Sequence, residues 1–77
     1  MTTIHNYLAV HGRMWGDDDD HIRLYEQMTV DEATNQFIAD VRAERKVPQE
    51  AVDAGEEWAD VYVFTVMAST APIVIQE

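Results

Sequence analysis

The sequence contains no cysteine among its 77 residues. Disulfide bonds, thiolate metal ligands and a cysteine nucleophile are therefore excluded. It also lacks an apolar run near the roughly 20 residues that a membrane-spanning helix needs. Its first residues lack the basic region and apolar core of a signal peptide. These absences favour the reducing cytoplasm, and we expect a cytoplasmic protein that does not bind a membrane.

Basic residues are scarce. Five lysines and arginines stand against fifteen aspartates and glutamates, which gives a net charge of −10. Nucleic acids and anionic membranes attract positive charge, so we expect no direct binding to either. The charge favours a basic protein surface as the partner, or it serves only to keep the chain in solution. Both interpretations remain open from composition alone.

Catalytic motifs are missing as well. Ser69 is the only serine, and no glycine-bounded elbow surrounds it. The sequence has neither a phosphate-binding loop nor a dinucleotide fingerprint. A chain of this size also leaves little room for a ligand pocket. We therefore predict a protein that is not an enzyme, with no catalytic residues and no cofactor.

One amphipathic helix is predicted over residues 29–46. Thr29 lies three residues before Glu32, which is the spacing of a capping box. Pro48 ends the helix, because the residue before a proline is driven out of the helical region. Apolar residues at spacings of three and four form one stripe that must pack on another element. The stripe consists of Val30, Ala33, Phe37, Ile38 and Val41.

Two segments that alternate in polarity precede this helix, at residues 4–11 and 21–28. Alternation predicts strands with one apolar face, joined here as an antiparallel hairpin. One register pairs apolar residues on the inner face: Ile4 with Met28, Leu8 with Leu24, and Val10 with Ile22. The same register sets Tyr7 opposite Tyr25 and His11 opposite His21 on the outer face.

After the helix, the residue pattern predicts a short helix at 48–54, a long strand at 58–69 and a short edge strand at 72–76. The long strand is apolar on both sides, and one helix covers only one face of a sheet. The other face needs the Trp15 loop, the short acidic helix or a second subunit. We predict a single α+β domain over residues 1–77. It has a three- to four-stranded, mainly antiparallel sheet of order ββαβ(β), with one long helix packed across one face.

The loop at residues 12–20 is long for a hairpin, and long loops are often functional. Tryptophan is enriched in interface hot spots, and methionine adapts to partner surfaces. The alternative is that Trp15 folds back over the hairpin. The predicted partner-binding residues are Met14, Trp15, Asp17, Asp18, Asp19, Asp20, Glu56 and Glu57.

The aspartate run, followed by His21, also resembles a cation site. The spacing of a calcium loop is absent, and two histidines fall short of a zinc site. We therefore predict no metal site.

Self-association is the second functional hypothesis, because an exposed apolar edge strand is a pairing site. The outer sheet face and the C-terminal strand would form a homodimer or a structural assembly. The residues predicted for this role are Tyr7, Tyr25, Ile73, Val74 and Ile75.

The order of two strands, a helix opening at Thr29-Val30-Asp31-Glu32-Ala33, and a further strand resembles several small bacteriophage proteins. The T7-type inhibitor of bacterial RNA polymerase is similar in layout. Small acidic anti-CRISPR and anti-restriction proteins are similar in size and charge. The resemblance implies a stoichiometric inhibitor, in the cytoplasm of the host, that docks on a basic surface of a nucleic-acid-processing enzyme. DNA mimicry would be one form of it, and would need carboxylates in two rows at phosphate-like spacing.

Overall fold

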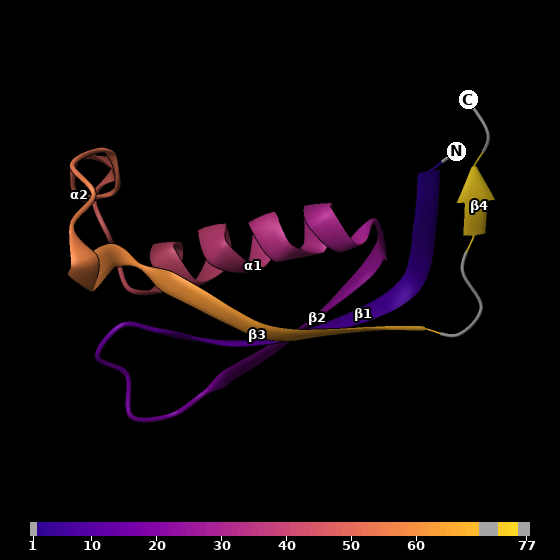
Figure 1. Ribbon diagram of the computed structural model, residues 1–77, viewed down its shortest axis with the longest axis horizontal. Coiled ribbons are helices and arrows are strands. Elements are labelled where there is room, and N and C mark those ends of the chain that lie inside the picture. Colours follow the sequence, from indigo (N-terminus) through magenta and orange to yellow (C-terminus); the bar gives the residue numbers. More distant parts are fainter. Residues whose placement is uncertain (1, 70–72, 76–77) are drawn as a thin grey trace.

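The computed structural model describes residues 2–69 and 73–75, with side chains for residues 3–69. A three-stranded antiparallel sheet of order β2-β1-β3 carries one long helix, and β4 pairs with the start of β1. The elements are β1 (Thr2–Met14), β2 (His21–Met28), α1 (Val30–Glu44), α2 (Gln49–Asp53), the 3-10 turn η1 (Glu57–Ala59), β3 (Val61–Ala68) and β4 (Ile73–Ile75). The predicted α+β class, with the long helix on the sheet, is confirmed (Figure 1).

Helix α1 begins with the predicted capping box. The Glu32 amide donates to Thr29 Oγ1 at 3.1 Å, and the Thr29 amide donates to Glu32 Oε1 at 3.1 Å. The helix ends at Glu44, two residues earlier than predicted, and Lys46 adopts a left-handed conformation with φ 55°. Its fully buried residues are Ala33, Phe37 and Val41. Val30, predicted as part of the stripe, is exposed because it is the first residue of the helix.

Gly12 belongs to β1 and not to the loop that the sequence predicts. A Cβ atom at this position would lie 2.8 Å from Phe37 Cε1 and 2.2 Å from the Tyr62 carbonyl oxygen. Only glycine lets α1 and β3 approach β1 this closely. The strand therefore runs on to Met14, whose side chain is buried in the core beside Phe37. The loop is shortened to residues 15–20.

The predicted register between the first two strands is wrong by one residue. Leu8 lies opposite Tyr25, Val10 opposite Arg23, and His11 opposite Ile22. A shift of one residue turns every side chain of β2 to the other face of the sheet. Tyr25 therefore points toward α1, while Ile22 and Leu24 point away from it. The cause lies on the helix, where Asp40 accepts a hydrogen bond from Tyr25 and Glu44 pairs with Arg23.

A β-bulge changes the alternation of β3. Its register with β1 shifts between His11 and Gly12, which leaves Phe64 without a partner residue. Before the bulge Val61 and Val63 pack against the core, and after it Val66 and Ala68 do so. The outward residues are Tyr62, Phe64, Thr65 and Met67. Strict alternation over residues 58–69 would set Val66 on the same face as Tyr62 and Phe64, and Met67 on the face of Val61 and Val63. The bulge reverses both positions.

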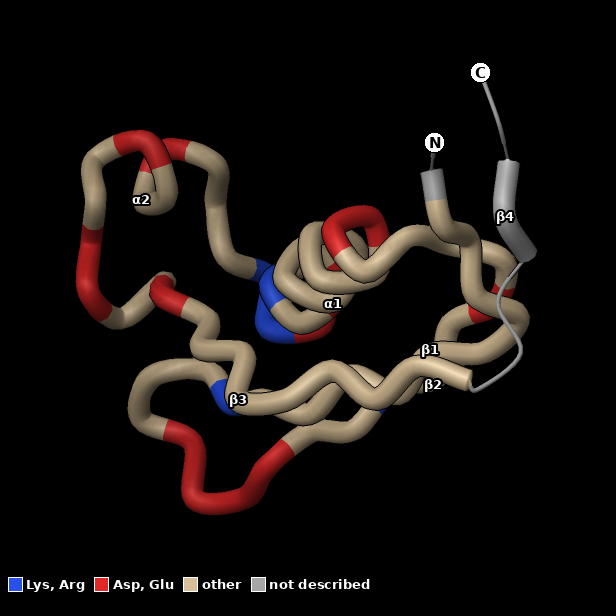
Figure 2. Tube along the Cα trace, turned by 45° about the vertical axis from the view of Figure 1, so that its right-hand side comes forward, with Lys and Arg blue, Asp and Glu red and all other residues tan. Residues whose placement is uncertain are grey.

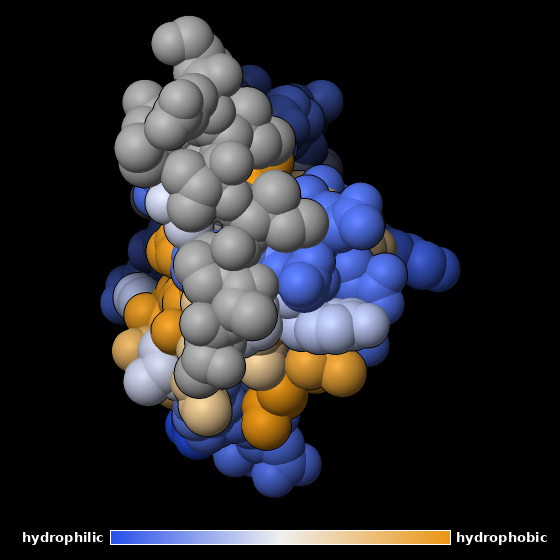
Figure 3. Space-filling view, turned by 90° about the vertical axis from the view of Figure 1, so that its right-hand side faces the viewer, coloured by the Kyte–Doolittle hydropathy of each residue, from blue (hydrophilic) through white to orange (hydrophobic). Residues whose placement is uncertain are grey.

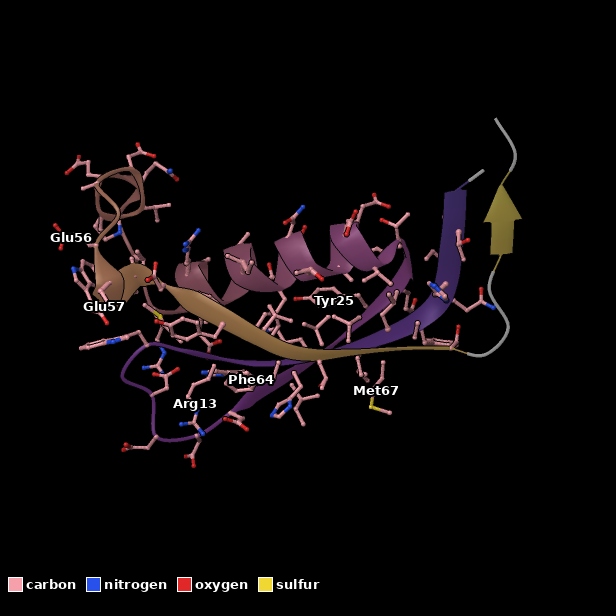
Figure 4. The ribbon with its side chains drawn as sticks, in the orientation of Figure 1. Arg13, Tyr25, Glu56, Glu57, Phe64 and Met67 are labelled. Carbon is pink, nitrogen blue, oxygen red and sulfur yellow. The ribbon has the colours of Figure 1, made fainter. Side chains whose placement is uncertain are left out.

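The sheet has one covered and one uncovered face. Helix α1 crosses one face, and Figure 1 shows no described helix or strand on the other. In Figure 4, Tyr25 points toward α1, whereas Arg13, Phe64 and Met67 point to the opposite side. Strand β1 also bends, so that its first residues and β4 stand beside the start of α1 (Figure 1). No helix in the described part of the chain is long and apolar enough to cross a membrane.

Candidate functional site

The four consecutive aspartates of the loop have two different roles. Asp17 lies 2.8 Å from His21 Nε2 and pairs with Arg45 at the end of α1. Asp20 lies 2.6 Å from His11 Nε2 and accepts a hydrogen bond of 2.7 Å from Arg13 Nε. The first and last aspartates therefore fasten the loop to the sheet and the helix, and their charges are neutralised within the chain.

The same contacts change the pKa values of both carboxyl groups. Partial desolvation raises the pKa of Asp17, but the hydrogen bond with His21 and the charge of Arg45 together bring it below its ordinary value. Hydrogen bonds with Arg13 and His11 hold the pKa of Asp20 below its usual range. Both groups therefore stay charged at neutral pH, as a fastening by ion pairs requires.

Asp18 and Asp19 remain directed to solvent. Both are exposed, and neither side chain bonds to another described residue. They line an open hollow of about 360 Å³ together with Gly16, Asp17, His21 and Arg45. Within the described residues no group of three or more histidine and carboxylate side chains is placed to hold a metal ion. The two inner aspartates thus carry the charge that the loop presents outward.

Trp15 is the first residue of this loop, and Trp58 of η1 lies close to it. Trp15 is 47% exposed and Trp58 is 42% exposed, and both line a second open hollow of about 380 Å³. The indole N–H of Trp15 donates to Glu57 Oε1 at 3.1 Å, and its backbone N–H donates to the Asp60 carbonyl at 2.9 Å. Trp15 therefore does not fold back over the hairpin but joins the loop to η1. Both hollows are open to solvent, and they share Gly16, Asp17 and Arg45 in their lining.

Trp58 is a candidate site residue that the sequence prediction missed, because it was assigned to the long strand. The sequence feature that could have identified Trp58 as a site residue is its position directly after Glu56 and Glu57. Met14, in contrast, is only 5% exposed and packs in the core, so its side chain is not available to a partner. This removes it from the predicted binding set.

Charge and aromatic surface meet at one end of the molecule. Figure 2 shows the acidic loop and the acidic segment around α2 on either side of the basic end of α1. Glu56 and Glu57 lie beside α2 in Figure 4. We name this surface the acidic end. Its members are Trp15, Asp18, Asp19, Glu56, Glu57 and Trp58.

The second candidate surface is the uncovered side of the sheet, which we name the outer sheet face. Five large side chains on it are between 53% and 75% exposed: Tyr7, Ile22, Leu24, Phe64 and Met67. His11 contacts Phe64 edge to face, with ring centroids 5.6 Å apart. In Figure 3, hydrophobic side chains reach the lower part of the molecule, on the side away from α1.

The residues predicted for self-association are not all placed on this face. Tyr7 is on it, but Tyr25 is buried on the opposite side and takes no part in the outer surface. The backbone of β4 pairs with β1, through Thr2 with Ile75 and Ile4 with Ile73. The side chains of Ile73, Val74 and Ile75 lie outside the described residues.

Comparison with known proteins found no matching family model, no matching curated protein and no matching solved structure.

Proposed function

We propose that this chain is a non-catalytic interaction module that docks its acidic end on a basic surface of another protein. The observation that carries the proposal is the pair of half-exposed tryptophans, Trp15 and Trp58, which share one hollow. Next to Trp15 in the loop, Asp18 and Asp19 form no ion pair with a described residue. Tryptophan supplies a large apolar contact, and free carboxylates attract a basic surface and set its orientation. Neither feature contributes to the hydrophobic core of the chain itself.

Internal neutralisation supports this assignment of roles. Asp17 and Asp20 hold the loop in place through Arg45 and Arg13. Asp18, Asp19 and Glu56 form no ion pair with a described residue, so their charge is available to a partner. A partner that covers the tryptophans would bring its cations close to these carboxylates. Such an arrangement combines an apolar centre with a charged rim, as is usual in protein interfaces.

The chemistry of the partner follows from the charge. Proteins that process nucleic acids carry basic surfaces that bind phosphates, and an acidic module competes for such a surface. The bacteriophage resemblance implies that such a module is a stoichiometric inhibitor of a nucleic-acid-processing enzyme. We include this role in the proposal.

Capture from a lysate of the native host, followed by elution with increasing salt, tests the proposal. The immobilised chain should retain a basic protein. Replacing Asp18 and Asp19 by asparagine should lower the salt needed for elution, because it removes charge that faces the partner. Replacing Glu26 by glutamine and Asp31 by asparagine removes the same charge elsewhere and should leave elution unchanged. Equal elution of all three proteins would contradict the proposal.

The contribution of the tryptophans needs a separate variant. Trp58→Ala removes an exposed side chain outside the core, so the fold should be kept. We expect it to weaken partner binding on the order of tenfold, as loss of a tryptophan anchor does. A matched replacement of an exposed aromatic on the outer sheet face, Tyr7→Ala, should not weaken it. If both variants bind as the unchanged chain does, the acidic end is not the docking site.

A further inference from the structure

The hollow that Trp15 and Trp58 share has two aromatic walls. Its lining consists of Met14, Trp15, Gly16, Asp17, Arg45 and Trp58. In the described part of the chain the one ring contact joins His11 to Phe64, so the two indoles do not stack on each other. No described arginine or lysine lies over either indole ring. The rings are only half covered, and their faces are therefore open to a side chain that enters from outside.

Both walls of the hollow are held in place by the fold. The backbone N–H of Trp15 donates to the Asp60 carbonyl at 2.9 Å, and its indole N–H donates to Glu57 Oε1 at 3.1 Å. The turn η1, which carries the other wall, is fixed through Ala59. This residue is 1% exposed, and its carbonyl oxygen accepts a hydrogen bond of 3.1 Å from Arg42 Nε on α1. A site with ordered walls loses little conformational entropy on binding, which favours a specific occupant.

The charge around the hollow is negative. Arg45 is the one cation among its lining residues, and Asp17 neutralises it through an ion pair of 2.5 Å. Asp18 and Asp19 line the adjoining hollow and form no ion pair with a described residue. Glu57 adds a further carboxylate at the N–H edge of one wall. A cation that enters would therefore meet carboxylates without a cation of their own, whereas an anion would be repelled.

We infer that the hollow receives an arginine side chain of the partner, with its guanidinium group stacked on the faces of Trp15 and Trp58. A guanidinium group is planar, always charged and more weakly hydrated than an ammonium group, so it stacks on indole rings more readily than lysine does. Its N–H groups lie in the plane of the stack and can donate to the carboxylates of Asp18 and Asp19. This inference rests on the function proposed above and names the side chain that anchors the partner.

Tryptophan fluorescence tests the inference, because Trp15 and Trp58 are the only tryptophans of the chain. The probes are capped peptides of glycine and serine that carry a single arginine, lysine, citrulline or phenylalanine. Citrulline keeps the shape of arginine without its charge. The arginine peptide should change the fluorescence and bind about threefold or more tighter than the lysine peptide. The other two should bind more weakly still. An arginine peptide that binds no tighter than the lysine or the phenylalanine peptide would overturn the inference.

Trp58→Leu separates stacking from charge. It keeps an apolar side chain at a position that is 42% exposed, so the fold should be kept, and Trp15 remains as the fluorescent reporter. Affinity for the arginine peptide should fall by about threefold to tenfold. Tyr7→Leu is the matched control, because it removes an exposed aromatic ring on the outer sheet face, and it should bind as the unchanged chain does. Equal affinities of Trp58→Leu and the unchanged chain would overturn the inference.

The inserted arginine and the docking function fail in different experiments. If the immobilised chain retains no basic partner from the lysate, the docking function is contradicted, and the inserted arginine with it. If a partner is retained and released by salt, but the arginine and lysine peptides bind equally, only the inserted arginine is contradicted. Charge alone would then bring the partner to the acidic end.

Discussion

The hydroxyl group of Tyr25 donates a hydrogen bond of 2.8 Å to Asp40 Oδ2 on α1. This contact fixes which face of β2 meets the helix. Because side chains alternate along a strand, an inward Tyr25 makes Leu24 point outward. A polar pair between sheet and helix thus accounts for the apolar residues on the outer sheet face.

Removing the Tyr25 hydroxyl should destabilise the fold. Tyr25→Phe keeps the ring but removes this hydrogen bond, so that among the described side chains Asp40 keeps the one from Gln36. Loss of a hydrogen bond to a charged group lowers the free energy of unfolding by about 1.5–3 kcal/mol. Urea denaturation measures the change. Tyr7→Phe, on the outer sheet face, is the control and should have the stability of the unchanged chain. An equal effect of both replacements would mean that the contact with Asp40 contributes nothing.

The same tyrosine should make stability depend on alkaline pH. Burial and the neighbouring Asp40 raise the pKa of Tyr25 above its ordinary value. The folded chain holds this proton more tightly than the unfolded chain. The contribution to stability is therefore complete below about pH 10, where a free tyrosine ionises, and is lost as the pH rises through the raised pKa. Denaturation of the unchanged chain and of Tyr25→Phe at increasing pH should show their difference shrinking above about pH 10. A constant difference would contradict the assignment.

Gly12→Ala should be among the most damaging single replacements. Its Cβ would meet a backbone oxygen of β3 at 2.2 Å, and backbone cannot yield without breaking the pairing of β1 with β3. We expect the free energy of unfolding to fall by about 3 kcal/mol or more, which is the upper end of the range for overpacked cores. Gly16→Ala is the comparison, because nothing lies within 4 Å of its Cβ and only φ +83° opposes it. In the Gly16→Ala variant the free energy of unfolding should fall by about 1 kcal/mol. Similar losses in thermal or urea denaturation would argue against close packing at Gly12.

Acid should release the fastening of the loop. The pKa of Asp20 is lowered by Arg13 and His11, so its contribution is present above the ordinary aspartate value of about 4. It is lost as the pH falls through the lowered pKa. The unchanged chain should be more stable than Asp20→Asn near neutral pH, and the difference should vanish in acid. Asp19→Asn, which breaks no ion pair, should match the unchanged chain throughout. If the unchanged chain is still more stable than Asp20→Asn in strong acid, the ion pairs of Asp20 do not fasten the loop.

The parts of the fold that depend on residues close together in the sequence were predictable. The capping box of Thr29 and Glu32 and the spacing of Ala33, Phe37 and Val41 define α1 without reference to the rest of the chain. The register of β2 was not predictable from its own residues, because its alternation offers two faces. The apolar face was the natural choice for the core, but Asp40 and Glu44 bind Tyr25 and Arg23 from across the fold.

The candidate site was predictable only in outline. The sequence locates the aspartate run and Trp15, but it treats four identical aspartates alike. Their division depends on Arg45 and His11, which reach the loop only after folding. The bulge at Phe64 and the burial of Met14 likewise follow from long-range packing with Gly12 and Phe37. These contacts determine which residues remain exposed for a partner.

The dependence of partner binding on salt is the most direct test of the docking role of the acidic end. Salt screens the attraction between exposed carboxylates and a basic surface. Retention of a basic partner by the immobilised chain should therefore weaken on raising sodium chloride from about 0.05 M to about 0.5 M. Replacing Asp18 and Asp19 by asparagine should make this dependence on salt smaller. Binding that does not change over the range, or an equal dependence for both proteins, would contradict the assignment of the acidic end to a basic partner.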